Sequence, residues 1–204
     1  MARRKYSVIV FDLGNVLIPF DYNIMFSRLE NVKKGLGEKF MHYYRNNYAL
    51  HRSFERGEIS DEVFIDKMLE SCDRSIDGLT FCKYYSEIFT VNENVAALLP
   101  ELKKKYKLVL LSNTNGIHRE YGYKQYDFLK HFDKLVLSHE AKAVKPEPEI
   151  YKAVEGFTRA SAEEHLFIDD VLEYVEGAKK MGWDAIQFKN FEQLVSELES
   201  RDIL

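Results

Sequence analysis

Four short apolar runs, each followed at once by a polar residue, constrain the fold more strongly than any other feature of the sequence. They are residues 8–11 before Asp12, 108–111 before Ser112, 135–137 before Ser138 and 166–168 before Asp169, with a fifth candidate at 185–188. Runs of this length and composition are typical of parallel strands that are buried on both faces. Segments with the apolar spacing of helices lie between them. Because strand and helix alternate, the sequence predicts an α/β fold with an open parallel sheet.

The alternation stops between residues 22 and 91, where we find helical patterns and no convincing strand. These patterns cover 24–36 and 40–50, begin again after the N-cap residue Ser60, and resume after a break at Gly78. We therefore predict a helical domain at 21–91, inserted into an α/β core made of 1–20 and 92–204. The tyrosines and phenylalanines of the insertion are expected to pack mainly in its own core.

The composition narrows the range of functions. The chain has 204 residues, 46% of them hydrophobic, which is enough for one full core and a smaller insertion. Its 29 basic and 33 acidic side chains give a formal net charge of −4 without an extended basic run, which argues against a nucleic-acid partner. Cys72 and Cys82 lack the pattern of a zinc site or a disulfide framework, so both are expected to be reduced core residues. The apolar run near the N-terminus is too short for a signal peptide or a membrane span, which predicts a cytoplasmic protein.

Polar residues follow three of the predicted strands, at the edge where a parallel sheet binds its ligands. Asp12 follows the first strand, Ser112 and Asn113 follow the second, and Asp169 and Asp170 follow another. Ligands of open parallel sheets bind outside the carboxyl ends of the strands, so these groups converge if their strands are neighbours. Carboxylates gathered in one place repel one another, and Mg²⁺ suits such oxygen ligands better than zinc does.

An aspartate beside such a cation can attack phosphorus. Water later hydrolyses the covalent aspartyl phosphate, so that one difficult step becomes two easier ones. The equatorial phosphoryl oxygens then need positive charge and hydrogen-bond donors. Ser112 and Asn113 offer donors, and Lys145, in the sequence VKPEPE, offers the charge. These residues predict a magnesium-dependent site for phosphoryl transfer.

Four segments resemble, in the same order, the motifs of the haloacid dehalogenase-like hydrolase superfamily. They are 11–17 (FDLGNVL), 110–114 (LLSNT), 145–151 (KPEPEIY), and 167–170 (FIDD) followed by 176–178 (EGA). The resemblance implies a Rossmann-like parallel sheet core with an inserted all-helical cap domain. The first two segments, together with 56–60 (RGEIS), are similar to bacterial sugar-phosphate phosphatases, α-D-glucose-1-phosphate phosphatase among them.

Carried over residue by residue, the resemblance implies a role for each matching position. Asp12 corresponds to the nucleophile and a metal ligand, and the backbone of Gly14 and the carboxylate of Asp170 correspond to further metal ligands. Ser112 and Lys145 correspond to the groups that hold the phosphoryl group. Asn113 and Thr114 correspond to the lining of the substrate pocket. Asp169 is either a further ligand or an anchor for the others. The implied cofactor is Mg²⁺, and the implied partner is a small phosphorylated metabolite.

Two positions depart from the pattern of the family. Its phosphatases usually carry a second aspartate two residues after the nucleophile, where it serves as general acid and base. That position is Gly14 here, which has no side chain to move a proton. Tyr174 stands where the family often has an acidic residue or asparagine, and Glu173 beside it is a candidate substitute.

The missing acid either restricts the substrate or requires a replacement. General acid catalysis is worth about 10²–10⁴-fold, and the need for it falls when the leaving group is already a weak base. One hypothesis is therefore that the substrate is a sugar 1-phosphate or an acyl phosphate. The other is that a nearby group, such as His118 or Asp21, replaces the acid. Comparing the turnover of glucose 1-phosphate and glucose 6-phosphate separates the two.

The sequence thus predicts a magnesium-dependent phosphatase that hydrolyses a small phosphorylated metabolite, such as a sugar phosphate, through an aspartyl phosphate. One alternative is a haloacid dehalogenase, in which the same aspartate attacks carbon and no metal is required. Another is a non-catalytic binding protein, because Gly14 replaces the usual acid. A mutase is least favoured, since it relies heavily on that acid. We expect no nucleic-acid or membrane partner, and the sequence leaves monomer and homodimer open.

Overall fold

A five-stranded parallel sheet forms the centre of the molecule in the computed structural model, which describes residues 5–204. The strands are β1 (Val8–Phe11), β2 (Lys107–Ser112), β3 (Lys134–Leu137), β4 (His165–Asp169) and β5 (Asp184–Gln187). They lie in the order β3-β2-β1-β4-β5, and every neighbouring pair is parallel. The predicted α/β fold is confirmed. The last strand ends at Gln187, one residue earlier than the sequence predicted.

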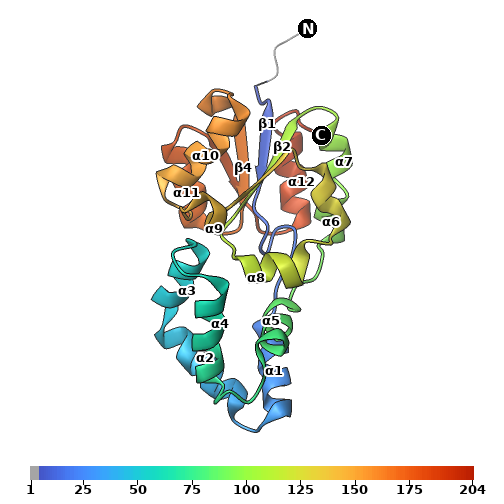
Figure 1. Cartoon of the computed structure of the whole chain (residues 1–204). Helices are drawn as coiled ribbons and strands as arrows, with labels where there is room; N and C mark the ends of the chain where they lie inside the picture. The colour runs from blue at the N-terminus through green and yellow to red at the C-terminus, as the bar shows by residue number, and fades with distance from the viewer. Residues whose placement is uncertain (1–4) are drawn as a thin grey trace.

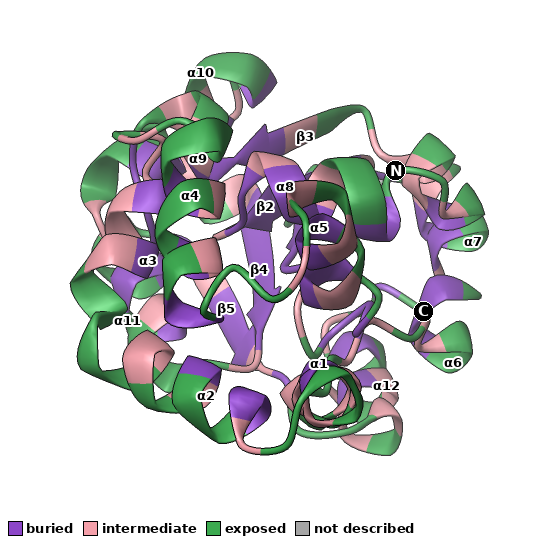
Figure 2. Ribbon diagram, turned by 60° about the horizontal axis from the view of Figure 1, so that its bottom comes forward, coloured by how far each residue is buried: buried purple, intermediate pink, exposed green. Residues whose placement is uncertain are grey.

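Helices cover both faces of the sheet. One face carries α6 (Glu93–Ala96), α7 (Leu99–Lys103) and α12 (Phe191–Glu199), and the other carries α9 (Ser138–Ala141), α10 (Pro148–Thr158) and α11 (Leu172–Lys180) (Figure 1). Successive strand residues point to opposite faces, so Ile9 and Phe11 pack in one apolar cluster while Val8 and Val10 pack in the other. Both faces of the strands are therefore buried, which explains their continuously apolar sequences (Figure 2).

Five helices between β1 and α6 form a separate group beyond the carboxyl ends of the strands (Figure 1). They are α1 (Tyr22–Val32), α2 (Leu36–Asn46), α3 (Tyr48–Glu55), α4 (Asp61–Ser71) and α5 (Gly78–Ser86). They share an apolar cluster of their own, which includes Phe40, Phe64 and Phe81. This group lies directly over the edge of the sheet where the polar strand ends are found.

The boundaries of these helices differ from the sequence patterns at three places. The pattern over 24–36 is broken before α2, where Gly35 adopts a left-handed conformation with φ of 84° that favours glycine. The pattern over 40–50 is broken at Asn47, where α2 ends and α3 begins. The last pattern was predicted to include Phe89, but α5 ends at Ser86 and Phe89 instead forms an isolated bridge with Phe20.

Short turns of helix complete the core. They are α8 (Gly116–His118), a π-helical turn η1 (Arg119–Tyr123), and the 3₁₀ turns η2 (Asp127–His131) and η3 (Ala162–Glu164). Cys72 and Cys82 are both buried and free, as predicted. Within residues 5–204, none of the helices combines the length and the apolar character needed to cross a bilayer.

Candidate active site

The order of the strands brings the predicted polar residues together. Strand β1 lies between β2 and β4, so Asp12, Ser112 and Asp169 leave three neighbouring strands at the same edge. The backbone N–H of Asp12 continues the β1–β4 pairing by donating to the carbonyl of Ile168 at 2.9 Å. Since Asp169 ends β4, Asp170 follows it at the same edge. The convergence follows directly from the parallel topology.

Lys145 lies at the centre of these groups. Its Nζ donates to Asp12 Oδ1 at 2.6 Å and to Asp169 Oδ2 at 2.5 Å, and the residue is only 1% exposed. Burial alone would lower the pKa of the ammonium group, but the two carboxylates outweigh burial and raise the pKa above its usual value. Lys145 is therefore a buried cation held between two strand ends.

The backbone of Lys145 is fixed by Asn113. The side-chain oxygen of Asn113 accepts from the N–H of Lys145 at 2.8 Å, and its amide nitrogen donates to the Lys145 carbonyl at 3.2 Å. Arg52, on α3, donates to the same carbonyl. The sequence predicted Asn113 as a donor to the phosphoryl oxygens and as part of the lining of the substrate pocket, whereas in the structure its amide also positions the lysine.

Three carboxylates form a cluster beside the lysine. Each of Asp12, Asp169 and Asp170 offers a carboxylate oxygen, and these oxygens lie within 4.8 Å of one another. Burial raises the pKa of Asp12 to about 7, with Asp169 and Asp170 adding to the effect and Lys145 opposing it. Burial likewise raises the pKa of Asp169. Oxygen ligands that repel one another at this spacing fit a hard divalent cation such as Mg²⁺.

Hydrogen bonds hold the outer carboxylates in place. Asp169 Oδ1 accepts from the N–H of Val171 at 2.8 Å while its other oxygen binds Lys145, so Asp169 is the most constrained of the three. Asp170 Oδ2 accepts from Asn15 Nδ2 at 3.0 Å. Asn15 lies in the segment that follows Asp12, so the loop after β1 also orients the carboxylate that follows β4.

The two positions that depart from the family pattern both lie at this site. A Cβ added at Gly14 would lie 3.4 Å from the Phe20 ring and 4.0 Å from Asp12 Oδ2, so a side chain at this position would begin beside the Asp12 carboxylate. The Tyr174 ring centroid lies 5.0 Å from Lys145 Nζ, within the range of a cation–π contact. Glu173, the suggested substitute, is exposed and turned to the surface.

A cavity of about 170 Å³ opens over the carboxylates, and we call it the carboxylate cavity. It is lined by Asp12, Gly14, Asn15, Phe20, Glu55, Asn113, Lys145, Asp170, Val171 and Tyr174. Its walls combine the three kinds of group that phosphoryl transfer requires: an aspartate, further oxygen ligands for a cation, and a positive charge.

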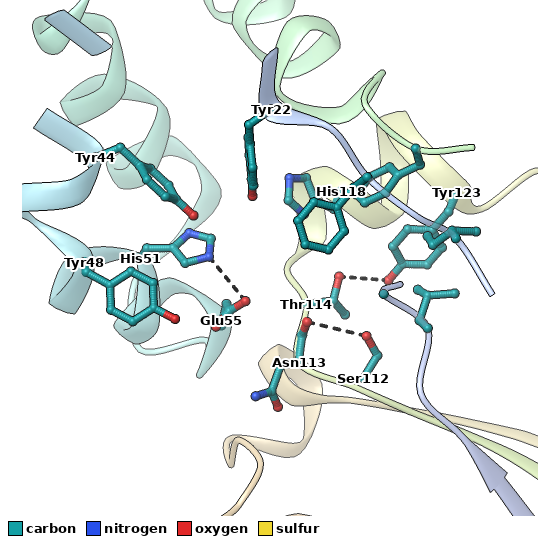
Figure 3. A pocket seen from close by; sticks show the side chains of 15 residues that line it. Tyr22, Tyr44, Tyr48, His51, Glu55, Ser112, Asn113, Thr114, His118 and Tyr123 are labelled. Carbon is teal, nitrogen blue, oxygen red and sulfur yellow. Dashed lines mark hydrogen bonds and ion pairs between the residues drawn. The ribbon is translucent and has the colours of Figure 1, made fainter. Parts of the chain in front are cut away.

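A larger cavity of about 320 Å³ adjoins it, and we call it the aromatic cavity (Figure 3). Its lining includes Leu13, Gly14, Ile18, Phe20, Tyr22, Tyr44, Tyr48, His51, Glu55, Phe89, Ser112, Asn113, Thr114, His118 and Tyr123. Thr114 Oγ1 and the Tyr123 hydroxyl lie 3.2 Å apart on the side of the core. Helices α1 to α3 supply the opposite wall, so this space lies between the helical insertion and the sheet.

The aromatic residues of the insertion divide between two roles. Phe40, Phe64 and Phe81 are buried in the core of the insertion, as the sequence predicted. Tyr22 and Tyr44 pack against this core and also line the aromatic cavity, as does Tyr48. Their helical spacing does not separate the two groups, because both faces of a short helix can be covered when other elements pack against it.

His118 lines the aromatic cavity and has a buried ring nitrogen without a hydrogen-bond partner in residues 5–204. Among the described residues, its Nε2 is one of two buried side-chain polar atoms without a hydrogen-bond partner. Asn115 Oδ1 accepts from the backbone N–H of His118, which turns the Asn115 amide nitrogen towards His118 Nδ1 at 3.2 Å. Nδ1 is therefore the acceptor, and Nε2 carries the proton of the neutral ring.

The two replacement acids suggested by the sequence are placed unfavourably. Burial lowers the pKa of His118 to about 3, so the ring is neutral near pH 7 and offers a hydrogen bond, not an acidic proton. The Asp21 side chain caps α1 by accepting from the N–H of Asn23 at 2.9 Å. Asp21 is absent from the lining of both cavities.

One acidic residue that sequence reasoning missed lines both cavities. Glu55, the last residue of α3, has Oε1 at 3.3 Å from His51 Nε2 and Oε2 at 3.3 Å from an Arg52 guanidinium nitrogen. Burial would raise the pKa of this carboxyl, but His51 and Arg52 outweigh it and hold the pKa below its usual value. The only signal in the sequence was an acidic residue five positions after the end of the aromatic helical pattern at 40–50.

Comparisons with known sequences place these features in a family context. The model of the haloacid dehalogenase-like hydrolase family matches residues 6–182. The D-ribitol-5-phosphate phosphatase of Bacteroides thetaiotaomicron is 25% identical over 192 residues, which cover 89% of this chain and 91% of that protein.

Two solved structures are similar over nearly the whole chain. An enzyme of the same family from Bacteroides thetaiotaomicron, in complex with magnesium and inorganic phosphate, has a TM-score of 0.76 and 25% identity, covering 93% of this chain and 98% of its own. The L-2-haloacid dehalogenase from Xanthobacter autotrophicus, with chloropropionic acid covalently bound, has a TM-score of 0.65 and 22% identity, covering 98% of this chain and 84% of its own. At 22% identity, the second likeness concerns the fold alone.

Proposed function

Because the chain belongs to the haloacid dehalogenase-like hydrolases, we propose that it is a magnesium-dependent phosphatase of small phosphorylated sugars or polyols. The observation that carries this proposal is the buried Lys145 between Asp12 and Asp169, in a cluster whose three carboxylates lie within 4.8 Å. Support comes from the similar D-ribitol-5-phosphate phosphatase and from the similar enzyme structure, which holds magnesium and phosphate.

The positions of individual residues support the roles that we propose for them. The Asp12 carboxylate attacks phosphorus, the bond to the leaving-group oxygen breaks, and an aspartyl phosphate forms. Attack of water at phosphorus then releases inorganic phosphate and restores the carboxylate. Lys145 and the Ser112 hydroxyl stabilise the phosphoryl oxygens during both steps.

Mg²⁺ would be held by the Asp12 and Asp170 carboxylates and the Gly14 carbonyl, with Asp169 anchoring Lys145. When bound, the ion neutralises negative charge on the phosphoryl group and on the cluster. The Gly14 carbonyl already accepts from the N–H of Val16 at 2.7 Å, and a carbonyl oxygen has a second lone pair for a ligand.

We assign the leaving group of the substrate to the aromatic cavity. The phosphoryl group would occupy the carboxylate cavity, and the sugar or polyol would lie between the sheet and helices α1 to α3. Tyrosine hydroxyls, Thr114 and His118 offer hydrogen bonds to its hydroxyl groups. In this proposal, residues 21–91 form a cap domain that selects the substrate, and 1–20 with 92–204 form the catalytic core.

The sequence left two explanations for the missing acid, a weakly basic leaving group or a replacement acid. The phosphatase relative is named for ribitol 5-phosphate, an ester of a primary alcohol and therefore of a strongly basic leaving group. This favours a replacement acid, and it widens the proposed substrates from sugar 1-phosphates to terminal phosphates of sugars and polyols.

A phosphatase screen over phosphorylated metabolites, with and without Mg²⁺, tests the function. We expect Mg²⁺-dependent release of phosphate from sugar and polyol phosphates, with glucose 6-phosphate or ribitol 5-phosphate turned over at least as fast as glucose 1-phosphate. Release of halide from a 2-haloacid in the presence of EDTA would instead identify a dehalogenase. No hydrolysis of any phosphate would support the non-catalytic alternative.

Magnesium should stabilise the protein, and more strongly at pH 8 than at pH 5. A ligand that binds only the folded state adds RT ln(1 + [L]/Kd) to stability, and the metal needs deprotonated carboxylates. Since the pKa of Asp12 is raised to about 7, protons compete with the metal below that pH. Asp170→Asn should remove the shift in Tm, whereas Asp127→Asn, whose side chain is 95% exposed, should retain it. An equal shift at both pH values would contradict this reading.

His118→Phe should weaken binding of the sugar with little effect on the chemical step. Phenylalanine keeps the ring that stacks on Tyr85, whose centroid lies 4.2 Å away, but it removes the Nε2–H donor. We expect KM for a sugar phosphate to rise roughly two- to tenfold, the equivalent of about 0.5–1.5 kcal/mol for one hydrogen bond. Inhibition by inorganic phosphate, which does not reach His118, should remain unchanged. A variant that also binds inorganic phosphate less tightly would count against this role.

A further inference from the structure

Both steps of the proposed reaction require a proton to move, and Gly14 has no side chain to move it. The leaving-group oxygen needs a proton when its bond to phosphorus breaks, and the attacking water must lose one. The acting group must therefore reach the boundary between the carboxylate cavity and the aromatic cavity. Of the described residues that line these two cavities, Glu55 is the only one with a titratable side chain that lines both.

We propose that Glu55, from the helical insertion, is the general acid and base of this phosphatase, and that His51 is the positioning residue that stores its proton. The proposal rests on the phosphatase function proposed above. It moves the acid–base group from the loop after β1, where the family usually has an aspartate, to the C-terminal end of α3 on the opposite wall.

Contacts with the core fix the position of Glu55. The hydroxyl of Ser138, the first residue of α9 directly after β3, donates to the Glu55 backbone carbonyl at 2.6 Å. Arg52, one turn earlier on α3, reaches the carbonyl of Lys145. The end of α3 is thus attached to the same loops that carry the phosphoryl-binding groups. Figure 3 shows the Glu55 side chain directed into the space between α3 and the Asn113–Thr114 segment.

The Glu55 carboxylate has a proton partner on the side away from the sheet. Its Oε1 lies 3.3 Å from His51 Nε2, and His51 Nδ1 lies 3.2 Å from the Tyr85 hydroxyl. His51 is itself buried, so the pair exchanges protons with little interference from bulk water. This is the arrangement of an acid–base residue oriented by a second group and a third, as in other enzyme sites.

The proton balance closes over one turnover. The pair begins with one proton between Glu55 Oε1 and His51 Nε2, which lie 3.3 Å apart. When Asp12 displaces the leaving group, this proton passes through Glu55 to the leaving-group oxygen, which leaves Glu55 as a carboxylate beside a neutral His51. When water attacks the aspartyl phosphate, Glu55 takes a proton from that water and returns it to His51. One molecule of water is consumed, the alcohol and inorganic phosphate are released, and the pair is restored.

Glu55→Gln tests this role through its dependence on the leaving group. With a sugar 6-phosphate, whose leaving group needs a proton, single-turnover phosphorylation should fall by about 10²–10⁴-fold. With 4-nitrophenyl phosphate, whose leaving group needs none, the first turnover should keep nearly the wild-type rate. The first turnover should appear as a burst of 4-nitrophenolate equal to the enzyme concentration, followed by slow turnover. Acid quench should then trap the aspartyl phosphate that accumulates.

The matched control is Glu58→Gln, the same substitution three residues later. The Glu58 side chain is 48% exposed and lines neither cavity, so both substrates should retain wild-type rates. His51→Asn should reproduce the difference between the two leaving groups, because Glu55 then lacks its stored proton. If the variant at Glu55 or at His51 slows phosphorylation equally with both substrates, the role proposed for that residue is overturned. The same holds if the variant slows phosphorylation with neither substrate.

The wild-type protein provides a second test that does not depend on the stability of any variant. Across aryl phosphates, the phosphorylation rate should depend only weakly on the pKa of the leaving group, because Glu55 supplies the proton. A steep dependence in the wild-type protein would overturn the proposal. These outcomes differ from failure of the phosphatase function itself, in which the wild-type protein would hydrolyse no phosphate ester.

Discussion

Replacing Asp12 with asparagine is expected to lower phosphatase turnover by on the order of 10⁴–10⁶-fold, the range expected when a nucleophile is removed. Asparagine has nearly the same shape, so the cavity is retained, but its amide oxygen cannot form the aspartyl phosphate. No burst of product and no acid-stable phosphoenzyme should appear with any substrate. Quench-flow measurement with 4-nitrophenyl phosphate checks this directly.

The same variant should be at least as stable as the wild-type protein near pH 8 without metal. The pKa of Asp12 in the folded protein is raised to about 7, above the value of an unfolded aspartate. A carboxyl with a raised pKa contributes full stability only below its unfolded pKa, and this stability is lost as the pH rises through the folded pKa. The neutral amide of the Asp12→Asn variant removes that loss, and Lys145 keeps Asp169 as its partner. A Tm of the variant well below that of the wild-type protein at pH 8 would contradict this expectation. It would show that the negative charge of Asp12 is needed for stability.

The sheet and the polar strand ends could be predicted because their signals are local. Each buried strand has a continuous apolar sequence, and parallel topology places the carboxyl ends of all strands at one edge of the sheet. Asp12, Ser112 and Asp170 therefore follow from position in the sequence together with strand order. Lys145 was proposed from its place between the second and third polar strand ends, and the resemblance to the family supported it; its burial could not be predicted from the sequence alone.

The contribution of the helical insertion could not be predicted, because it depends on how two apolar clusters meet. Tyr44 and Phe40 belong to the same helical pattern, yet one lines a cavity and the other is in the core. Glu55 reaches the site only because the end of α3 is attached to Ser138 and to the Lys145 loop. A single sequence records neither contact, since both join segments far apart along the chain.

Lys145→Met should be the most destabilising substitution at the site, as well as an inactivating one. Methionine has a similar volume, but it leaves Asp12 and Asp169 without the cation that lies 2.6 and 2.5 Å from them. Removing one partner of a buried ion pair costs about 3–5 kcal/mol, because the remaining charge is uncompensated. That is a large part of the roughly 5–15 kcal/mol by which a typical domain is stable. Urea unfolding of the metal-free protein measures the loss.

The sign of the pH dependence separates this electrostatic loss from simple mispacking. Without the lysine, the pKa values of both carboxyls rise further, so the folded variant keeps its protons to higher pH than the unfolded chain does. Its stability then falls as the pH rises, and the deficit relative to wild type should be larger at pH 8 than at pH 5. Lys152→Met, at an exposed position on α10, should show no such difference. A deficit of the same size at both pH values would mean that Lys145 stabilises the site by filling space, and its proposed role as the charge that balances Asp12 would have to be abandoned.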